Sequence, residues 1–367
     1  MNFLIVWAVS YHIGESDRFG NEVAKAVETA RSRQETRGRE QAMVAWSRSG
    51  CLRGLLTLVL ALSAAQASAE PYPTRTITII TPFAAGSVTD AAARMIGQSL
   101  QDALGQSVVV ENRAGAGGLP AANAVARAKP DGYTLFFTTN STHSAANGLY
   151  KNVPYDPIKD FTPIARIGSF PSFVAVNPEL PVNSIGELMA YAKANPGKLS
   201  YGVGNSTGHI AGETIKKRTG TDIVRVNYRS NPAVVTDLIA GHIPMAIPDF
   251  NTGLPQLKTQ KVRALAVLTK ERNRVLPDVP TLSETVMPGF DILAWAGMFG
   301  PANLPPEIVK VLADAVQKAL STPPVIERLN AGGTEVFWSG PQDFSDFVKT
   351  ELVKWTAAIK EAGIEPE

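Results

Sequence analysis

The sequence contains 367 residues, of which 35 are Lys or Arg and 33 are Asp or Glu, so its formal net charge is +2. This balanced charge, without a basic stripe, argues against a nucleic acid as partner. Only four histidines and one cysteine occur, and their spacing fits no metal site, so we expect neither a metal nor another cofactor.

The amino-terminal part predicts export. Residues 43–69 hold basic residues, then the apolar run 55–65, and then an A-x-A pattern at 67–69. The apolar run is too short to span a membrane, and the A-x-A pattern is typical of a cleavage site. We therefore expect a signal peptide at 43–69 that is cleaved after Ala69. No later apolar stretch is long enough to cross a bilayer.

The amino-terminal part also contains residues 1–42, which precede the predicted signal peptide, and the single cysteine. Because a signal peptide normally begins a chain, residues 1–42 are predicted to be an over-extended start, with an amphipathic helical extension as the alternative. The single cysteine, Cys51, lies inside the signal and far from its cleavage site. The exported protein should therefore contain no disulfide, and Cys51 is not expected to carry a lipid.

The stretch at 76–100, TITIITPFAAGSVTDAAARMIGQSL, predicts a strand, a turn of small residues and an amphipathic helix. Ser87 followed by Asp90 matches the capping-box pattern, with Ser87 as N-cap. The backbone N–H groups of residues 86–89 would then be free to bind an anion at the positive end of the helix. The alternative is a plain connection whose small residues only save space.

Strands and helices alternate along the rest of the chain, as in domains whose parallel sheets are covered on both faces. Further strands are predicted at 107–112, 132–139, 171–178, 198–204, 223–228, 243–250 and 262–269. The chain becomes helical from Pro305, and this tail is expected to pack back on the first domain. Segments 164–173 and 289–301 are expected to cross between two domains, which would make the first discontinuous and allow a hinge.

The segment GNSTG at 204–208 matches the G-x-S-x-G nucleophile elbow of serine hydrolases. Ser206 would then be the nucleophile. Its base would have to be His242, oriented by Asp222 or Asp237. These residues follow Ser206 within a short stretch, and no HGGG-type loop precedes it, which weighs against catalysis. A secreted serine hydrolase is kept as the alternative function.

Glycine-rich and polar loops follow several predicted strands. GAGGLP at 115–120 lacks the final glycine of a dinucleotide-binding loop and follows the second strand, so its glycines are better explained by positive φ and close backbone approach. Four further loops, rich in Gly, Ser, Thr and Asn and without Lys or Arg, lie at 83–90, 138–147, 202–209 and 248–253. These loops would line a ligand cleft or would cap helices, and the same loop can do both.

Nine stretches occur in the order typical of one family. They are YPTRTITIITPFAAGSVTDAAAR, VVVENRAGAGG, KPDGYTLFF, YDPIKDFTPIARI, YGVGNSTGHIAGE, VNYRSNPAVVTDLIAGHI, KVRALAVLT, LPDVPTLSE and FGPANLPPEIV. Over nearly all of the exported part, the sequence resembles the substrate-binding proteins of tripartite tricarboxylate transporters, also called the Bug family.

The resemblance implies an α/β fold of the type II periplasmic-binding-protein class. Each of two lobes would be a mainly parallel sheet flanked by helices, with the ligand cleft between the lobes. Residues 70–170 and 291–367 would form lobe 1, and residues 171–290 lobe 2. The resemblance also implies a periplasmic receptor without enzyme activity. It would deliver a small organic carboxylate, either a di- or tricarboxylate or an aromatic carboxylate, to membrane permease subunits. A sensor protein is a further candidate partner, and we expect a monomer.

The expected ligand residues lie in the four polar loops and at one further aromatic position. They are Phe83, Ala85, Gly86, Ser87, Asp90, Asn140, Ser141, His143, Gly204, Asn205, Ser206, His209, Asp249, Phe250 and Trp295. The resemblance implies binding through backbone N–H groups, hydroxyls and water, without a dedicated arginine. The sequence departs from the family at 86–87, where Gly-Ser replaces Gly-Gly, and at 228–230, where Tyr-Arg-Ser replaces Tyr-Lys-Gly. Phe83, Phe250 and Trp295 would wall an aromatic ligand or belong to the core.

Overall fold

The computed structural model describes residues 25, 28–29 and 72–367. The predicted signal peptide at 43–69, its cleavage site and nearly all of the predicted over-extended start lie outside these residues. Among the helices of the described part, none combines the length and the apolar character that crossing a membrane requires.

The strands within residues 72–367 form two sheets. The first contains β1 (Ile77–Thr81), β2 (Val108–Asn112), β3 (Thr134–Thr139), β4 (Phe161–Phe170), β10 (Ala294–Pro301) and β11 (Glu335–Ser339), in the order β11-β4-β10-β3-β1-β2. The second contains β5 (Phe173–Val176), β6 (Leu199–Val203), β7 (Ile223–Asn227), β8 (Met245–Ala246) and β9 (Arg263–Val267), in the order β7-β6-β8-β5-β9. The chain enters the second sheet directly after β4 and returns to the first at β10.

Both sheets are mixed. In the first sheet, β1 is parallel to β2 and β3, whereas β10 is antiparallel to β3 and β4, and β11 is antiparallel to β4. In the second, β6 is parallel to β7 and β8, whereas β5 is antiparallel to β8 and β9. The prediction of two helix-flanked sheets is confirmed, but they are less parallel than expected. The two strands that follow the crossings are β5 in the second sheet and β10 in the first. Each of them runs antiparallel to both of its neighbours.

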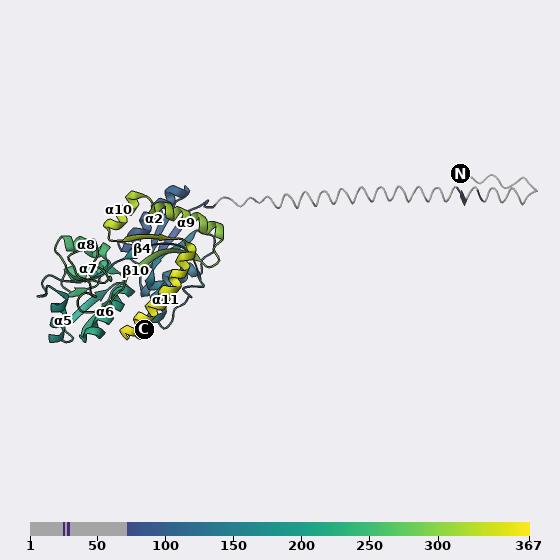
Figure 1. Ribbon diagram of the computed structural model, residues 1–367. Helices are drawn as coiled ribbons and strands as arrows, with labels where there is room; N and C mark the ends of the chain where they lie inside the picture. Colours follow the sequence, from purple (N-terminus) through teal and green to yellow (C-terminus); the bar gives the residue numbers. More distant parts are fainter. Residues whose placement is uncertain (1–24, 26–27, 30–71) are drawn as a thin grey trace, which may run out of the picture. The chain divides into compact units, whose positions relative to one another are not determined.

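The helices are connected to these strands along the chain. They are η1 (Ala116–Gly118), η2 (Ser141–Ala145), α2 (Val88–Leu104), α3 (Leu119–Ala126), α4 (Ala146–Leu149), α5 (Ile185–Ala194), α6 (Ser206–Thr219), α7 (Asn231–Ile239), α8 (Phe250–Lys258), α9 (Pro306–Leu320), α10 (Pro323–Ala331) and α11 (Pro341–Ala362). Figure 1 shows α5 to α8 grouped around the second sheet and α2, α9 and α10 near the first.

The two faces of the first sheet have different cores. On one face α2 and α9 pack aliphatic side chains such as Ile96 and Leu312 against Ile79. On the other face the core is aromatic, with Trp295 and Phe344 in edge-to-face contact at 5.6 Å between ring centroids. Because both faces of the sheet are closely packed, the sheet is rigid. The carboxyl ends of β1 and β3 are therefore held in fixed positions at one edge of this sheet.

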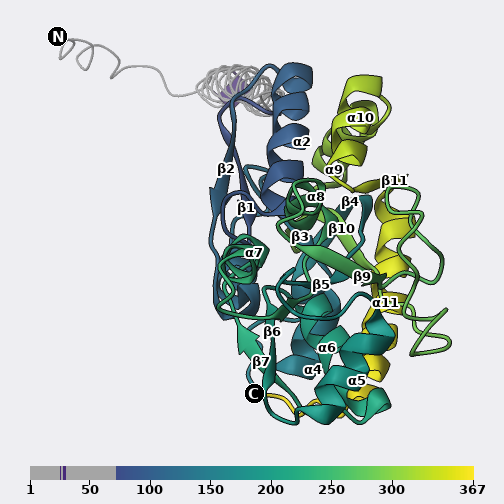
Figure 2. The same cartoon turned by 90° about the vertical axis from the view of Figure 1, so that its left-hand side faces the viewer.

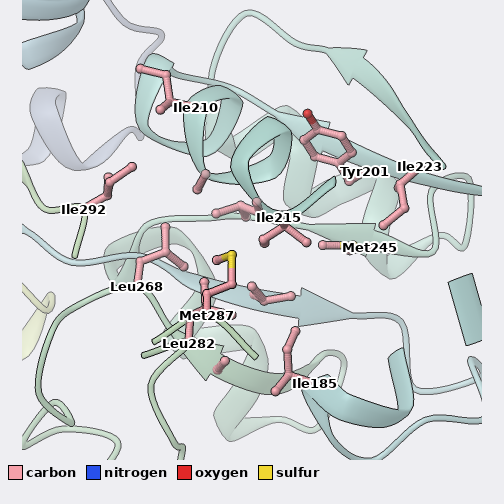
Figure 3. Packing of buried hydrophobic residues seen from close by; sticks show 14 of the residues in the cluster. Ile185, Tyr201, Ile210, Ile215, Ile223, Met245, Leu268, Leu282, Met287 and Ile292 are labelled. Carbon is pink, nitrogen blue, oxygen red and sulfur yellow. The ribbon is translucent and has the colours of Figure 1, made fainter. Parts of the chain in front are cut away.

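The core of the second sheet surrounds Tyr201, Ile215 and Met245, which Figure 3 shows packed together. Trp355 and Ile359 of α11 belong to the same cluster. The helical tail was expected on the first domain alone. Instead α11, with 22 residues and therefore about 33 Å long, also contacts α6. Figure 2 shows it extending from the level of β11 toward α5 and α6.

Removal of the buried Trp355 side chain should destabilise the protein. Trp355 is 2 % exposed, and its indole Nε1 donates to Glu351 Oε2 at 2.8 Å. We expect Trp355→Ala to lower the free energy of unfolding by about 3 kcal/mol in urea titrations, because it leaves a cavity in the core. Val353→Ala on the same helix removes a side chain that is 71 % exposed and should change stability by less than about 0.5 kcal/mol. Equal effects of the two variants would contradict the packing described for α11.

Candidate functional site

Two adjacent cavities are lined by loops of both sheets. The inner pocket has a volume of about 20 Å³ and the outer chamber about 310 Å³. The inner pocket is lined by Phe83, Ser87, Val88, Thr89, Thr139, Asn140, Ser141, Phe170, Ser172, Gly204, Asn205, Thr207, Ser230, Asn231, Asp249 and Ala294. The outer chamber is lined by Pro82, Phe83, Gly115, Ala116, Gly117, Gly118, Ser141, Leu149, Tyr150, Val203, Gly204, Asn205, Ser206, His209, Asn227, Tyr228, Arg229 and Glu367.

Four helices begin at the inner pocket. Their N-cap residues are Ser87 for α2, Asn205 for α6, Ser230 for α7 and Asp249 for α8, and all four line the pocket. The unpaired N–H groups of a first helical turn carry partial positive charge, so four such ends favour an anionic ligand. The geometry arises because α2, α6 and α7 follow the carboxyl ends of parallel strands, where loops of α/β sheets gather.

The turn before α2 confirms one prediction and corrects another. Ser87 is the N-cap, and its hydroxyl accepts from the Asp90 amide at 3.2 Å. However, the Asp90 carboxylate accepts from the Gly86 amide at 2.9 Å, and the Ser87 amide donates to the Ala84 carbonyl. Of the N–H groups expected to be free at 86–89, two are therefore occupied. In the described part of the chain, those of Val88 and Thr89 have no hydrogen-bond acceptor.

Asp90 is held within this turn and lines neither cavity. Burial alone would raise the pKa of its carboxyl, but hydrogen bonds from the Gly86 amide, Arg94 and Asn112 keep the pKa below its usual value. Its role in the structure is to fix the turn. Ala85 and Gly86 are exposed at the outer side of the same turn and line neither cavity.

Polar side chains join the two sheets beside the pocket. Asn140 Nδ2 donates to Ser206 Oγ and to Thr207 Oγ1, both at 3.2 Å. The hydroxyls of Ser141 and Ser206 are 2.8 Å apart. Because none of these groups is a base, the partners found for Ser206 do not activate it as a nucleophile. Asp237 does contact His242 at 3.3 Å, but neither residue lines the inner pocket or the outer chamber.

Asp249 brings a carboxyl group to the wall of the inner pocket. Asn231 donates its amide to this carboxyl, and the Thr252 amide and hydroxyl each donate to Oδ1 at 3.0 Å. Burial raises the pKa of Asp249, although these hydrogen bonds oppose the shift. Its oxygens are therefore already engaged in capping α8, and Asn231 is positioned by the same contact.

Three predicted ligand residues lie in packed cores and not in the cavities. The imidazole of His143 is completely buried and stacks on Phe299 at 4.0 Å, and burial lowers its pKa to about 3. Trp295 belongs to the same aromatic cluster, and Phe250 packs against Phe173. Their sequence positions next to polar loops suggested a ligand wall, but the strands and helices that carry them turn these rings inward.

The structure brings most of the other predicted residues together. Those that line a cavity are Phe83, Ser87, Asn140, Ser141, Gly204, Asn205, Ser206, His209 and Asp249. Residues that the prediction missed include Asn231, Tyr150 and Arg229. Arg229 is exposed and lines the outer chamber, so one cation does face the cavity. Arg229 could have been predicted from the Tyr-Arg-Ser sequence at 228–230, which differs from the family pattern. Asn231 could have been predicted from the Ser-Asn-Pro sequence, which is typical of a helix start.

His209 faces the outer chamber as a neutral group. Burial, together with the positive charge of Arg225, lowers the pKa of its imidazole to about 4. Its Nε2 atom is buried and has no hydrogen-bond partner among the described residues. The part of the chain that the structure describes contains no group of three or more His, Cys, Asp or Glu residues that could hold a metal.

The sequence and the fold of the chain are both similar to those of known proteins. Residues 92–364 match the family described as the tripartite tricarboxylate transporter family receptor. Protein BugT of Bordetella pertussis is 34% identical over 303 residues, which cover 82% of this chain and 93% of BugT. The structure of R. palustris Rpa4515 with adipate is 35% identical and superposes with a TM-score of 0.78, covering 81% of this chain and 100% of the other. MatC from Rhodopseudomonas palustris with bound malate is 32% identical, with a TM-score of 0.75 and coverage of 78% and 100%.

Gly204 should not tolerate a side chain. A Cβ atom at this position would lie 2.3 Å from the Ser230 carbonyl carbon and 2.4 Å from the Asn231 nitrogen, so the start of α7 would have to move. We expect Gly204→Ala to lower the free energy of unfolding by about 1–3 kcal/mol in urea titrations. Gly186→Ala is the matched control, because its Cβ would meet only Ser184 Oγ at 3.8 Å, and it should be neutral or slightly stabilising. Unchanged stability of Gly204→Ala would contradict the described contact.

Burial of neutral His143 should make stability depend on pH. The unfolded chain binds a proton near pH 6.5, whereas the folded protein does so only near pH 3. This contribution to stability is therefore lost as the pH falls from about 6.5 toward 3. The expected slope is about 1.4 kcal/mol per pH unit, which His143→Gln should remove from urea titrations between pH 6 and 4. His242→Gln, which removes an exposed imidazole, should keep the wild-type slope, and a similar loss in both variants would argue against the assignment.

Proposed function

Because the chain belongs to the tripartite tricarboxylate transporter receptor family, we propose that it binds a small organic carboxylate in the periplasm and delivers it to the membrane permease of such a transporter. The neighbouring structures contain adipate and malate, which are both carboxylates. The observation that carries the proposal is the start of four helices at one pocket, which favours a negatively charged ligand.

The ligand is proposed to lie at the junction of the two cavities. Phe83, Ser141, Gly204 and Asn205 line both, so a carboxylate there would face the first turns of α2 and α6. Because the Ser141 and Ser206 hydroxyls are hydrogen-bonded to each other, one of them would donate to the other and the second would donate to the carboxylate. The body of the ligand would extend into the outer chamber, whose 310 Å³ suits a small acid. Arg229 would attract a second acidic group at the chamber wall.

The protein is proposed to act as a receptor and not as an enzyme. Among residues 72–367, the side chain of Ser206 contacts Asn140 and Ser141 and no base, which supports a binding role. We also propose that the exported protein begins at Glu70, and that it works as a monomer. A sensor protein remains an alternative recipient of the liganded form.

The division into lobes is also a proposal. Residues 70–170 and 291–367 would form lobe 1, and residues 171–290 lobe 2. All strands of the first sheet fall within the first set and all strands of the second sheet within the other, which supports this division. The lobes would separate to admit the ligand and close around it.

Titration calorimetry with mono-, di- and tricarboxylates tests the proposed function. At least one carboxylate should bind, and Ser206→Ala should weaken binding about fivefold, which corresponds to one hydrogen bond of about 1 kcal/mol. Ser99→Ala is the matched control, because its hydroxyl donates only to the Met95 carbonyl within α2. Absence of binding across the panel, or ester hydrolysis that Ser206→Ala abolishes, would overturn the proposal.

A further inference from the structure

One cluster of buried apolar side chains is shared by the two proposed lobes. Four such clusters lie within residues 72–367, and three of them contain residues of a single lobe. The fourth, around Tyr201 of lobe 2, also contains the lobe 1 residues Ala145, Leu149, Ile292, Trp355 and Ile359. Parting this cluster would expose apolar surface to water, which costs free energy. The shared cluster is therefore where the lobes are held together most firmly.

Helix α11 contributes side chains to the cores of both sheets. Phe344 and Val348 near its start belong to the aromatic cluster of the first sheet. Trp355 and Ile359 near its end belong to the shared cluster. No glycine or proline occurs at positions 342–362, so the helix has no residue that would favour a bend. Helix α11 therefore connects the two cores as one rigid element.

The ion pairs that join the lobes lie at the same end of α11. Of the ion pairs among the described residues, two connect the lobes. Glu361 pairs with Arg218 of α6, and Glu367 pairs with Arg225 of β7. Glu367 is also tied to lobe 1, because its amide donates to the Leu149 carbonyl at 2.9 Å. Exposed ion pairs contribute little energy, so the apolar cluster carries most of this attachment.

Elsewhere the described parts of the lobes meet through polar side chains and a glycine turn. Asn140 contacts the start of α6 beside the inner pocket, and Asn273 of lobe 2 donates to Glu335 Oε1 at 2.9 Å. At Gly333 a Cβ atom would lie 2.4 Å from Phe250 Cβ, so this turn has no side chain that could insert into lobe 2. Polar groups that part can bond to water instead, whereas buried apolar side chains cannot. These contacts therefore part at a lower cost than the shared cluster.

We infer that lobe 2 rotates about the end of α11 when the cleft opens, with the shared cluster as a fixed pivot. Ile292 extends this pivot to the crossing between the sheets, because it precedes β10 and its amide donates to the Leu268 carbonyl at 3.2 Å. Elements far from the pivot, such as α2 of lobe 1 and α7 of lobe 2, would move apart. This pivot requires the proposed division into lobes, but it requires no particular ligand.

Distance measurements between spin labels by electron paramagnetic resonance test the pivot on the exported protein. Residues 70–367 contain no cysteine, so labels attach only to introduced cysteines. The first pair is Thr356→Cys on α11 with Lys193→Cys on α5. The second pair is Gln98→Cys on α2 with Thr236→Cys on α7, and all four positions are exposed. Lys193→Cys with Thr236→Cys, both in lobe 2, is the control for the width that the labels themselves cause.

Without added ligand, the α11–α5 distance should be distributed as narrowly as the control distance, because a pivot keeps its distance from the lobe that rotates about it. The α2–α7 distribution should be at least about twice as wide, since the unliganded protein samples open and closed arrangements. An α11–α5 distribution as wide as the α2–α7 distribution, or three equal widths, would overturn the pivot. Carboxylate binding in calorimetry would leave the proposed receptor function intact in either case.

Substitutions in the shared cluster then locate the pivot. Trp355→Ala should widen the α11–α5 distribution and leave the control distribution unchanged, because it removes the main apolar contact of α11 with lobe 2. Ile359→Ala takes its place if Trp355→Ala does not fold. Val353→Ala is the matched control on the same helix, because its side chain is 71 % exposed, and it should keep the wild-type width. Equal α11–α5 widths in the cluster variant and in Val353→Ala would overturn the assignment of the pivot to this cluster.

Discussion

The first turn of every helix exposes backbone N–H groups that no residue of the same helix can accept from, and the site depends on where these groups end up. In this protein the starts of α2, α6, α7 and α8 meet at one small pocket. Side chains at the N-caps satisfy some of the donors, as Asn205 does for the Gly208 amide at 2.8 Å. The remainder define the electrostatic character of the pocket, because their partial charges add at one point.

The two sheets are coupled on both sides of that pocket. Beside it, Asn140 and Ser141 contact the start of α6. Farther away, α11 packs Trp355 into the core of the second sheet, and Glu361 forms an ion pair with Arg218 of α6. The proposed separation of the lobes would therefore not be free. It would have to break the polar contacts at the pocket and either deform the packing of α11 or use α11 as its pivot.

The sequence predicted features that depend on local backbone chemistry. The Ser87 cap and the run of alternating strands and helices follow from residue pattern alone, because caps and periodicity are short-range. The direction of β10 was not predicted, since antiparallel insertion between β3 and β4 is a long-range event. The same limit applies to His143 and Trp295: proximity to a polar loop does not tell which way a side chain turns, and packing turned both inward. Arg229 was not predicted as a ligand residue, because it lies outside the four polar loops without Lys or Arg, although it belongs to the Tyr-Arg-Ser sequence that departs from the family pattern.

The donors at this pocket belong to the main chain, and that has a consequence for mutational change. Replacement of the Val88 or Thr89 side chain alters shape but leaves each N–H group in place, since every residue except proline carries one. The anion-attracting part of the site is therefore nearly independent of residue identity. Substitutions in the chamber wall, at Tyr150 or Arg229 for example, can alter which molecule fits without dismantling the charge complementarity. Such a scaffold can acquire new ligand preferences through single changes while keeping its attraction for acids.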